Sequence, residues 1–170
     1  MTEKEIKDKI LEVFQSQRKN PTAEFDGSHF MDYLTFPAHP KNTIKNSFRG
    51  ARKYYRFMDK LEMEFGICFS LQDLDKYYSV DQLSKKVLDR IKKGKGNNMI
   101  LKRRLEEKEK YYFEIALILI LGGIYYWQGI NWISILLSIG FGIVIYWILS
   151  NKIYSKIHDK KLADKILEKK

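Results

Sequence analysis

Few side chains in this sequence are of the types that perform catalysis or bind metals. The chain has three histidines and one cysteine among its 170 residues. His29 and His39 lie in one loop near Asp26 and Asp32, but without a cysteine or glutamate at the usual ligand spacing. Cys68 stands in a short apolar segment, which favours a buried, inert thiol over a nucleophile. We therefore expect no enzyme activity, no bound metal and no cofactor.

Residues 111–150 are the most apolar part of the chain. They contain no Lys or Arg, and Glu114 is their one charged residue. Two arms, 111–127 and 132–149, flank a short polar turn, and at ~1.5 Å rise per residue each is about 25 Å long, near the ~30 Å hydrocarbon core of a bilayer. The sequence therefore predicts a two-helix transmembrane hairpin. We interpret Glu114 as an acid that reaches the interface or pairs with Lys110, with a functional acid as the alternative.

Basic residues flank this predicted hairpin on both sides. Residues 85–110 hold eleven Lys or Arg against four acids, and residues 151–170 hold seven against three. The positive-inside rule then places both termini in the cytoplasm, at a cytoplasmic membrane of bacterial inner-membrane type. The basic blocks are expected to contact anionic headgroups. Nucleic-acid binding is the weaker explanation, because the position beside the membrane already accounts for the charge.

Small residues recur inside the predicted hairpin. Ser134, Ser138 and Gly142 are four residues apart on one helix face, and Gly122 and Gly123 in the first arm could receive them. Small side chains let membrane helices approach closely. The pattern predicts helix packing, either within a tight hairpin or between copies in a homo-oligomer.

Residues 1–92 carry the pattern of a small domain of four helices. Capping boxes at Thr2–Glu5 and Ser79–Gln82 mark two helix starts, and Gly66 marks the end of a long second helix. Apolar residues recur at helical spacing between these signals. The predicted fold class is all-α, a small four-helix bundle followed by the two-helix transmembrane hairpin.

Two further segments complete the predicted domain organisation. Residues 93–110 are a basic linker or juxtamembrane helix, and a flexible polar break at 92–98 marks the boundary before it. Residues 151–170 are a basic cytoplasmic tail. This tail either lengthens the second arm of the hairpin or lies on the membrane surface.

The pattern over about residues 2–91 resembles that of acyl carrier proteins. In that family the second helix ends in a leucine–acid–acid–phenylalanine–glycine–isoleucine type of segment, which Leu61–Ile67 resembles. Tyr77–Leu83 is similar to the family's start of the last helix, and Ser28–Leu34 is similar to its loop. The resemblance implies an acyl-carrier-like bundle of four helices.

The resemblance does not extend to the prosthetic-group site of that family. Carrier proteins attach phosphopantetheine to a serine at the head of the second helix, and the matching position here is Ala51, which has no hydroxyl. Ser47 lies one turn earlier and is the remaining candidate attachment site. The resemblance thus implies a retained fold without carrier chemistry, with a divergent carrier using Ser47 as the least favoured alternative.

The second helix is basic where the carrier family is acidic, which suits acidic partners. We predict that a partner-binding surface combines basic side chains of this helix with aromatic side chains of the preceding loop: Arg49, Arg52, Lys53, Arg56, Phe30, Tyr33 and Phe36. The predicted function is a membrane-anchored, non-enzymatic adaptor that holds an acidic protein partner at the cytoplasmic membrane face. The alternative is a membrane effector or immunity-type protein whose hairpins oligomerise, with the soluble domain as sensor.

Overall fold

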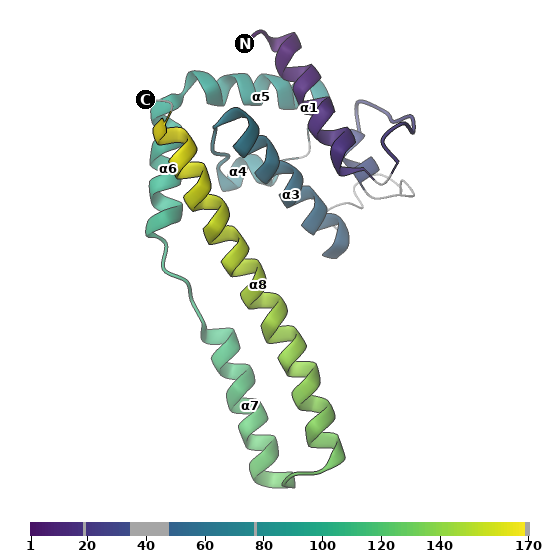
Figure 1. Ribbon diagram of the computed structural model, residues 1–170, viewed down its shortest axis with the longest axis vertical. Helices are drawn as coiled ribbons and strands as arrows, with labels where there is room; N and C mark the ends of the chain where they lie inside the picture. Colours follow the sequence, from purple (N-terminus) through teal and green to yellow (C-terminus); the bar gives the residue numbers. More distant parts are fainter. Residues whose placement is uncertain (19, 35–47, 77, 169–170) are drawn as a thin grey trace. The chain divides into compact units, whose positions relative to one another are not determined.

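The computed structural model describes the whole chain except residues 19, 35–47, 77 and 169–170. In the described residues the regular structure is helical throughout, without strands, which confirms the all-α prediction. The chain divides into two compact units (Figure 1). The helical unit comprises Met1–Arg103 with Lys161–Lys170, and the hairpin unit comprises Arg104–Lys160.

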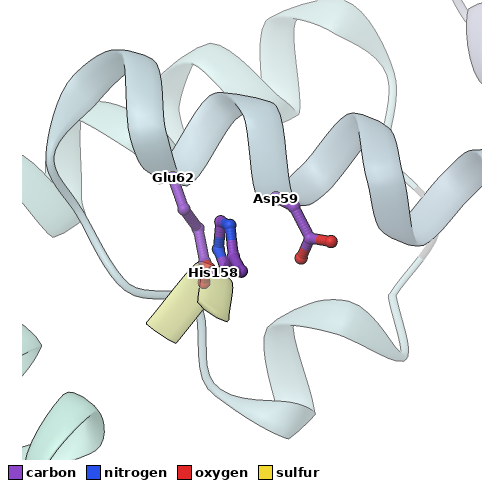
Figure 2. Close-up of side chains that lie close together, drawn as sticks. All are labelled: Asp59, Glu62 and His158. Atoms are coloured by element: carbon purple, nitrogen blue, oxygen red, sulfur yellow. The ribbon is translucent and has the colours of Figure 1, made fainter. Parts of the chain in front are cut away.

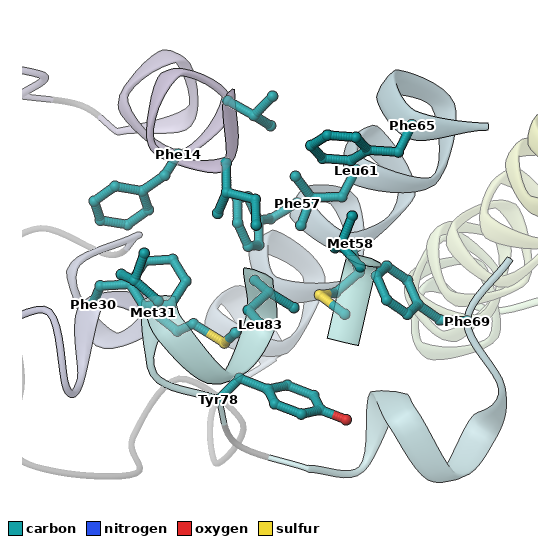
Figure 3. Close-up of a cluster of buried hydrophobic side chains, with 14 of the residues drawn as sticks. Phe14, Phe30, Met31, Phe57, Met58, Leu61, Phe65, Phe69, Tyr78 and Leu83 are labelled. Carbon is teal, nitrogen blue, oxygen red and sulfur yellow. The ribbon is translucent and has the colours of Figure 1, made fainter. Parts of the chain in front are cut away.

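Three helices enclose the main core of the helical unit. α1 (Glu3–Gln17) packs against both α3 (Phe48–Phe65) and α5 (Val80–Lys92), and the 3-10 helix η1 (Phe30–Leu34) packs on α3. Their apolar side chains meet in one continuous cluster (Figure 3). Burying such side chains contributes about 1.5–3 kcal/mol each, so this cluster is the main source of stability. Its largest fully buried members include Tyr54, Phe14, Phe30, Phe57 and Phe69.

Capping boxes begin three of the helices. Thr2, Ser70 and Ser79 are the N-caps of α1, α4 (Leu71–Leu74) and α5. Each cap side chain accepts a hydrogen bond from the backbone N–H three residues later, and the side chain of that residue accepts one from the cap N–H. The helix starts predicted at Thr2 and Ser79 are confirmed.

The segment after α3 is held by Glu62. Gly66 adopts a φ of 63°, and its N–H donates to the backbone oxygen of Glu62 at 2.9 Å, so α3 ends where the glycine predicts. The buried Glu62 carboxylate then accepts a hydrogen bond from the Phe69 N–H at 2.6 Å. Figure 2 shows Asp59 and Glu62 projecting from the same side of α3, while His158 in that view belongs to the hairpin unit.

A buried network of charges fastens α4 to α5. The Asp73 carboxylate on α4 contacts the Lys86 ammonium at 2.7 Å and also the Arg90 guanidinium, both on α5. Burial alone raises the pKa of Asp73. Hydrogen bonds from Lys86, from the Ser70 N–H and from Arg90 outweigh that effect and lower the pKa to about 2.

Arg18 organises the loop between α1 and η1. Its guanidinium donates a hydrogen bond to the backbone oxygen of Ala23 at 2.5 Å, and its Nε donates to that of Tyr33 at 3.4 Å. The same group lies over the rings of Phe14 and Phe25, 5.2 and 5.4 Å from their centroids. Desolvation lowers the pKa of Arg18. This loop is therefore packed onto the helical unit by a buried cation between two aromatic rings.

The flexible break predicted at 92–98 is wrong, because α6 (Gly94–Glu106) runs through most of it. Asn97 anchors the first turns of this helix. Its side-chain amide donates to the backbone oxygen of Arg90 at 2.8 Å, and its side-chain oxygen accepts from the Cys68 N–H at 3.4 Å. These two hydrogen bonds connect α6 to α5 and to the segment after α3.

The C-terminal end of the chain belongs to the helical unit. α8 (Trp132–Glu168) is one continuous helix, so residues 151–168 lengthen the second arm, which is one of the two arrangements expected for this segment. Apolar side chains from the end of this helix enter a second buried cluster of the helical unit, which contains Cys68, Leu101, Leu162, Ala163 and Ile166. Burial of these side chains explains why the segment does not remain a free tail.

Candidate functional site

One side of α3 is buried in the core and the opposite side carries exposed cations. The basic face of α3 consists of Arg49, Arg52, Arg56 and Lys60, all exposed and spaced three or four residues apart. Residues at this spacing lie on one side of a helix. Tyr55, 48% exposed, lies next to this face. Three of the basic residues predicted to bind a partner are therefore placed together on one surface.

Lys53 has a different place from the other predicted cations. It is only partly exposed, and its ammonium donates a hydrogen bond to the backbone oxygen of Leu34 at 2.7 Å. This contact ties the end of η1 to α3. We therefore correct the prediction for Lys53 and assign it to holding the loop, because its charge is already directed at a backbone carbonyl.

The aromatic residues of the loop do not form the predicted exposed anchor. Phe30 has no exposed surface, and its ring packs against that of Phe14 with 5.0 Å between centroids. The prediction for Phe30 is therefore wrong, since a large apolar ring is more stable in the core than at the surface. Tyr33 is half-buried. Phe36 and the candidate attachment residue Ser47 lie outside the described residues.

The loop acids and the cysteine, considered above as possible metal ligands or a nucleophile, take part in local structure. Asp26 accepts hydrogen bonds from the Ser28 N–H at 2.9 Å and from the Ser28 hydroxyl at 2.7 Å, which closes a turn. Asp32 is buried in η1, and His39 lies outside the described residues. Cys68 is a buried free thiol, as its apolar neighbours predict.

The hairpin unit consists of α7 (Tyr112–Gln128) and the main part of α8, which lie side by side and antiparallel (Figure 1). By length and composition α8 is able to cross a membrane, and only 6% of its most apolar stretch is buried. α7 is a shorter apolar helix. Most of the apolar surface of the two helices thus points away from the protein.

An ion pair joins the two helices at the open end of the hairpin. The Lys152 ammonium lies 2.5 Å from the Glu114 carboxylate and 2.6 Å from the backbone oxygen of Lys110. It also lies 4.7 Å from the centroid of the Tyr111 ring. The predicted pairing of Glu114 with the Lys110 side chain is corrected, because the opposite helix supplies the cation.

Hydroxyl groups and a capped turn close the other end of the hairpin. The hydroxyls of Tyr125 and Ser138 form a hydrogen bond of 2.7 Å between α7 and α8. Asn131 caps α8 by accepting the Ser134 N–H at 2.9 Å, and the Ser134 hydroxyl donates to the Gly129 oxygen at 2.8 Å. Gly129 adopts a φ of 67°, which favours glycine. Ser134 and Ser138 therefore act within the hairpin.

The three glycines of the predicted helix packing are Gly122 and Gly123, expected to receive the serines, and Gly142, on the same face as the serines. A Cβ atom added at Gly122, Gly123 or Gly142 would meet no atom of the described residues within 4 Å. The predicted packing of serines on glycines is corrected, because the bulky Tyr125 side chain bridges the two helices there. The glycines instead border open space.

Sequence reasoning missed Lys152 and Tyr125, which make the contacts between the two helices. The available signal was weak, because Lys152 is one of several cations that follow the second arm and Tyr125 is one of several aromatic residues beside the turn. Comparisons of the chain with protein families, with curated proteins and with solved structures found no match. What the chain does is therefore inferred from two surfaces, the apolar hairpin and the basic face of α3.

Proposed function

We propose that the chain is a membrane-anchored, non-enzymatic adaptor. In this proposal α7 and α8 cross the bilayer as a hairpin, and the basic face of α3 binds an acidic protein partner. The observation that carries the proposal is the exposure of most apolar side chains of the hairpin, combined with an ion pair at one end and hydroxyl contacts near the other. Lipid hydrocarbon stabilises such a surface, whereas water does not.

The dimensions of the hairpin match a bilayer. From Trp132 to Lys152 α8 rises about 30 Å at ~1.5 Å per residue, which is the thickness of the hydrocarbon core. Lys152 then stands at one interface. Trp127 and Trp132, both exposed, stand at the other, where aromatic rings with a polar edge are favoured.

The charges on either side of the hairpin support a single orientation. Basic residues precede α7 and follow the membrane segment of α8, while the turn between the helices carries no charge. The positive-inside rule places both basic ends, and the helical unit with them, in the cytoplasm. The same residues attract anionic lipid, at about 1 kcal/mol for each well-placed cation.

The basic face of α3 supports an acidic protein as the partner. Arginine and tyrosine contribute strongly to protein interfaces, and here three arginines lie beside the exposed Tyr55. The guanidinium group pairs with carboxylates through two parallel hydrogen bonds, which adds geometric specificity to the attraction of charge. The adjacent ring adds apolar contact area to this recognition.

Photo-crosslinking in the native membrane tests this assignment. A benzophenone amino acid replaces Tyr55 in the full-length chain. Irradiation should yield a product with a second, different polypeptide, and Arg49→Glu with Arg52→Glu should reduce that product at least tenfold. The matched control is Lys4→Glu with Lys85→Glu, which changes the net charge equally at exposed residues of α1 and α5. Products with lipid alone, or equal yields from both double variants, would contradict the assignment.

A further inference from the structure

The outer side of α8 carries a regular apolar seam. The α8 seam consists of side chains that follow one another at alternating intervals of four and three residues. The apolar members are each 49–74% exposed, and a serine occupies one position: Trp132, Leu136, Ile139, Ile143, Tyr146, Ser150, Ile153 and Ile157. An average spacing of 3.5 residues is that of two helices wound into a left-handed coiled coil.

The hairpin uses the other side of the same helix. Ser134, Ser138 and Lys152 make the contacts with α7. Since an α-helix has 3.6 residues per turn, these three residues lie well away from the α8 seam around the helix axis. The seam is therefore a second, separate surface of α8, and contacts among the described residues do not account for its regular spacing.

The seam continues beyond the segment that lipid hydrocarbon would cover. Lys152 marks the membrane interface in the proposed insertion, and Ile153 and Ile157 follow it. Both stay exposed next to Lys156, where hydrocarbon no longer covers them. A second helix that follows the seam would cover them in the same way as the residues inside the membrane. Lys160 occupies the next position and ends the seam.

Two glycines border the seam and leave room for a close neighbour. Gly140 and Gly142 lie on its two sides, and a Cβ atom at either would meet no atom within 4 Å in the described part of the chain. Glycine at such positions lets the backbone of a second helix approach closely. Contacts within the hairpin do not explain this pair of residues.

From these observations we infer that α8 of one chain packs along α8 of a second copy of this chain, in parallel, through the α8 seam. The inference rests on the proposed membrane insertion, which gives all copies one orientation. The two seams then cross the bilayer and end at the same level, so each residue meets its counterpart across a two-fold axis. The apolar side chains, at roughly 100 Å² each, bury about 700 Å² per copy, close to the ~800 Å² of a stable interface.

Cysteine crosslinking in isolated membranes tests the paired seam. The full-length chain carries Cys68→Ala and one new cysteine at Ile153, at Ile157 or, as control, at Ser155. The control residue is exposed between the two seam positions but lies on another side of the helix. Seam positions of a parallel pair face their counterparts across the interface, so a small adjustment brings the Cβ atoms to the ~3.8 Å of a disulfide. Copper phenanthroline should therefore yield disulfide dimers at both seam positions, at least tenfold above the control.

The outcomes separate this inference from the proposed function. Protein that resists carbonate extraction but gives no dimer, equal yields at all three positions, or a disulfide to a different polypeptide overturns the seam pairing alone. Protein that carbonate releases overturns membrane insertion and the pairing together.

Counting photobleaching steps of labelled chains in nanodiscs adds a readout without new cysteines. The unmodified seam should give two steps, and Ile153→Lys with Ile157→Lys should give one; two steps from both would overturn the pairing.

Discussion

The ammonium of Lys152 lies 2.5 Å from the carboxylate of Glu114, although the two residues are 38 positions apart in the chain. Their contact joins α7 to α8 at the end of the hairpin that is opposite the turn. Glu114 is 4% exposed, and Lys152 is the cation that compensates its charge among the described residues. Removal of one member of a buried pair costs about 3–5 kcal/mol, whereas removal of both costs far less.

The ion pair predicts the order of stability in a set of variants. Lys152→Met should lower the thermal midpoint of the detergent-solubilised chain by several degrees, because it leaves the Glu114 charge without its partner. Adding Glu114→Gln should restore most of that loss. Size-exclusion chromatography after heating measures the midpoint, and Lys156→Met, at an exposed lysine one turn away, is the control. A double variant as unstable as Lys152→Met alone would show that the pair is not coupled.

Asp73 predicts a loss of local stability in acid. Its pKa is about 2 in the folded chain and ~3.9 in an unfolded one. The folded state therefore binds its proton more weakly. This carboxylate contributes about 2 kcal/mol above pH ~4, and the contribution is lost as the pH falls toward 2.

Hydrogen exchange of α4 and α5 between pH 5 and pH 2.5 measures this effect in the full chain, after correction for the intrinsic exchange rate. Protection should fall with the pH in the unmodified protein. Asp73→Asn should have less protection at pH 5 and a weaker dependence on pH. Asp75→Asn, at an exposed neighbouring position, should keep the normal dependence. The same pH response in all three proteins would refute the role of Asp73.

The second apolar cluster predicts that the end of α8 protects Cys68. Leu162→Ala should increase the rate at which a maleimide labels the thiol at least tenfold, because truncating a buried leucine costs about 2–5 kcal/mol and favours local opening. Asp164→Ala changes an exposed residue of the same helix turn and should leave the rate unchanged. Equal labelling rates in the two variants would show that the C-terminal segment does not cover the thiol.

Elements marked by local signals could be predicted from the sequence. Thr2 and Ser79 carry capping boxes, and Gly66 ends α3, because the relevant hydrogen bonds join residues at most four positions apart. At the turn, the ends of the two apolar arms were predicted to within two residues of the observed helix ends, since Gly129 and Asn131 interrupt the apolar pattern.

Contacts between distant segments could not be predicted. Lys152 reaches Glu114 because α8 is longer than α7, and no local pattern specifies the register between two helices. Phe30 was expected at the surface, but three-dimensional packing places its ring against Phe14 in the core. Leu162 likewise joins Cys68 through tertiary packing. Of the predicted partner-binding surface, the basic face of α3 follows from helical spacing alone, whereas the loop aromatics depended on tertiary structure.

Accessibility from the two sides of the membrane tests the membrane hairpin most directly. In a Cys68→Ala chain, single cysteines replace Ile130 in the exposed turn and Ser155 on α8. An impermeant maleimide should label position 130 in right-side-out vesicles and position 155 only in inside-out vesicles. Labelling of both positions from the same side would contradict a hairpin that crosses the bilayer and holds the helical unit at its cytoplasmic face.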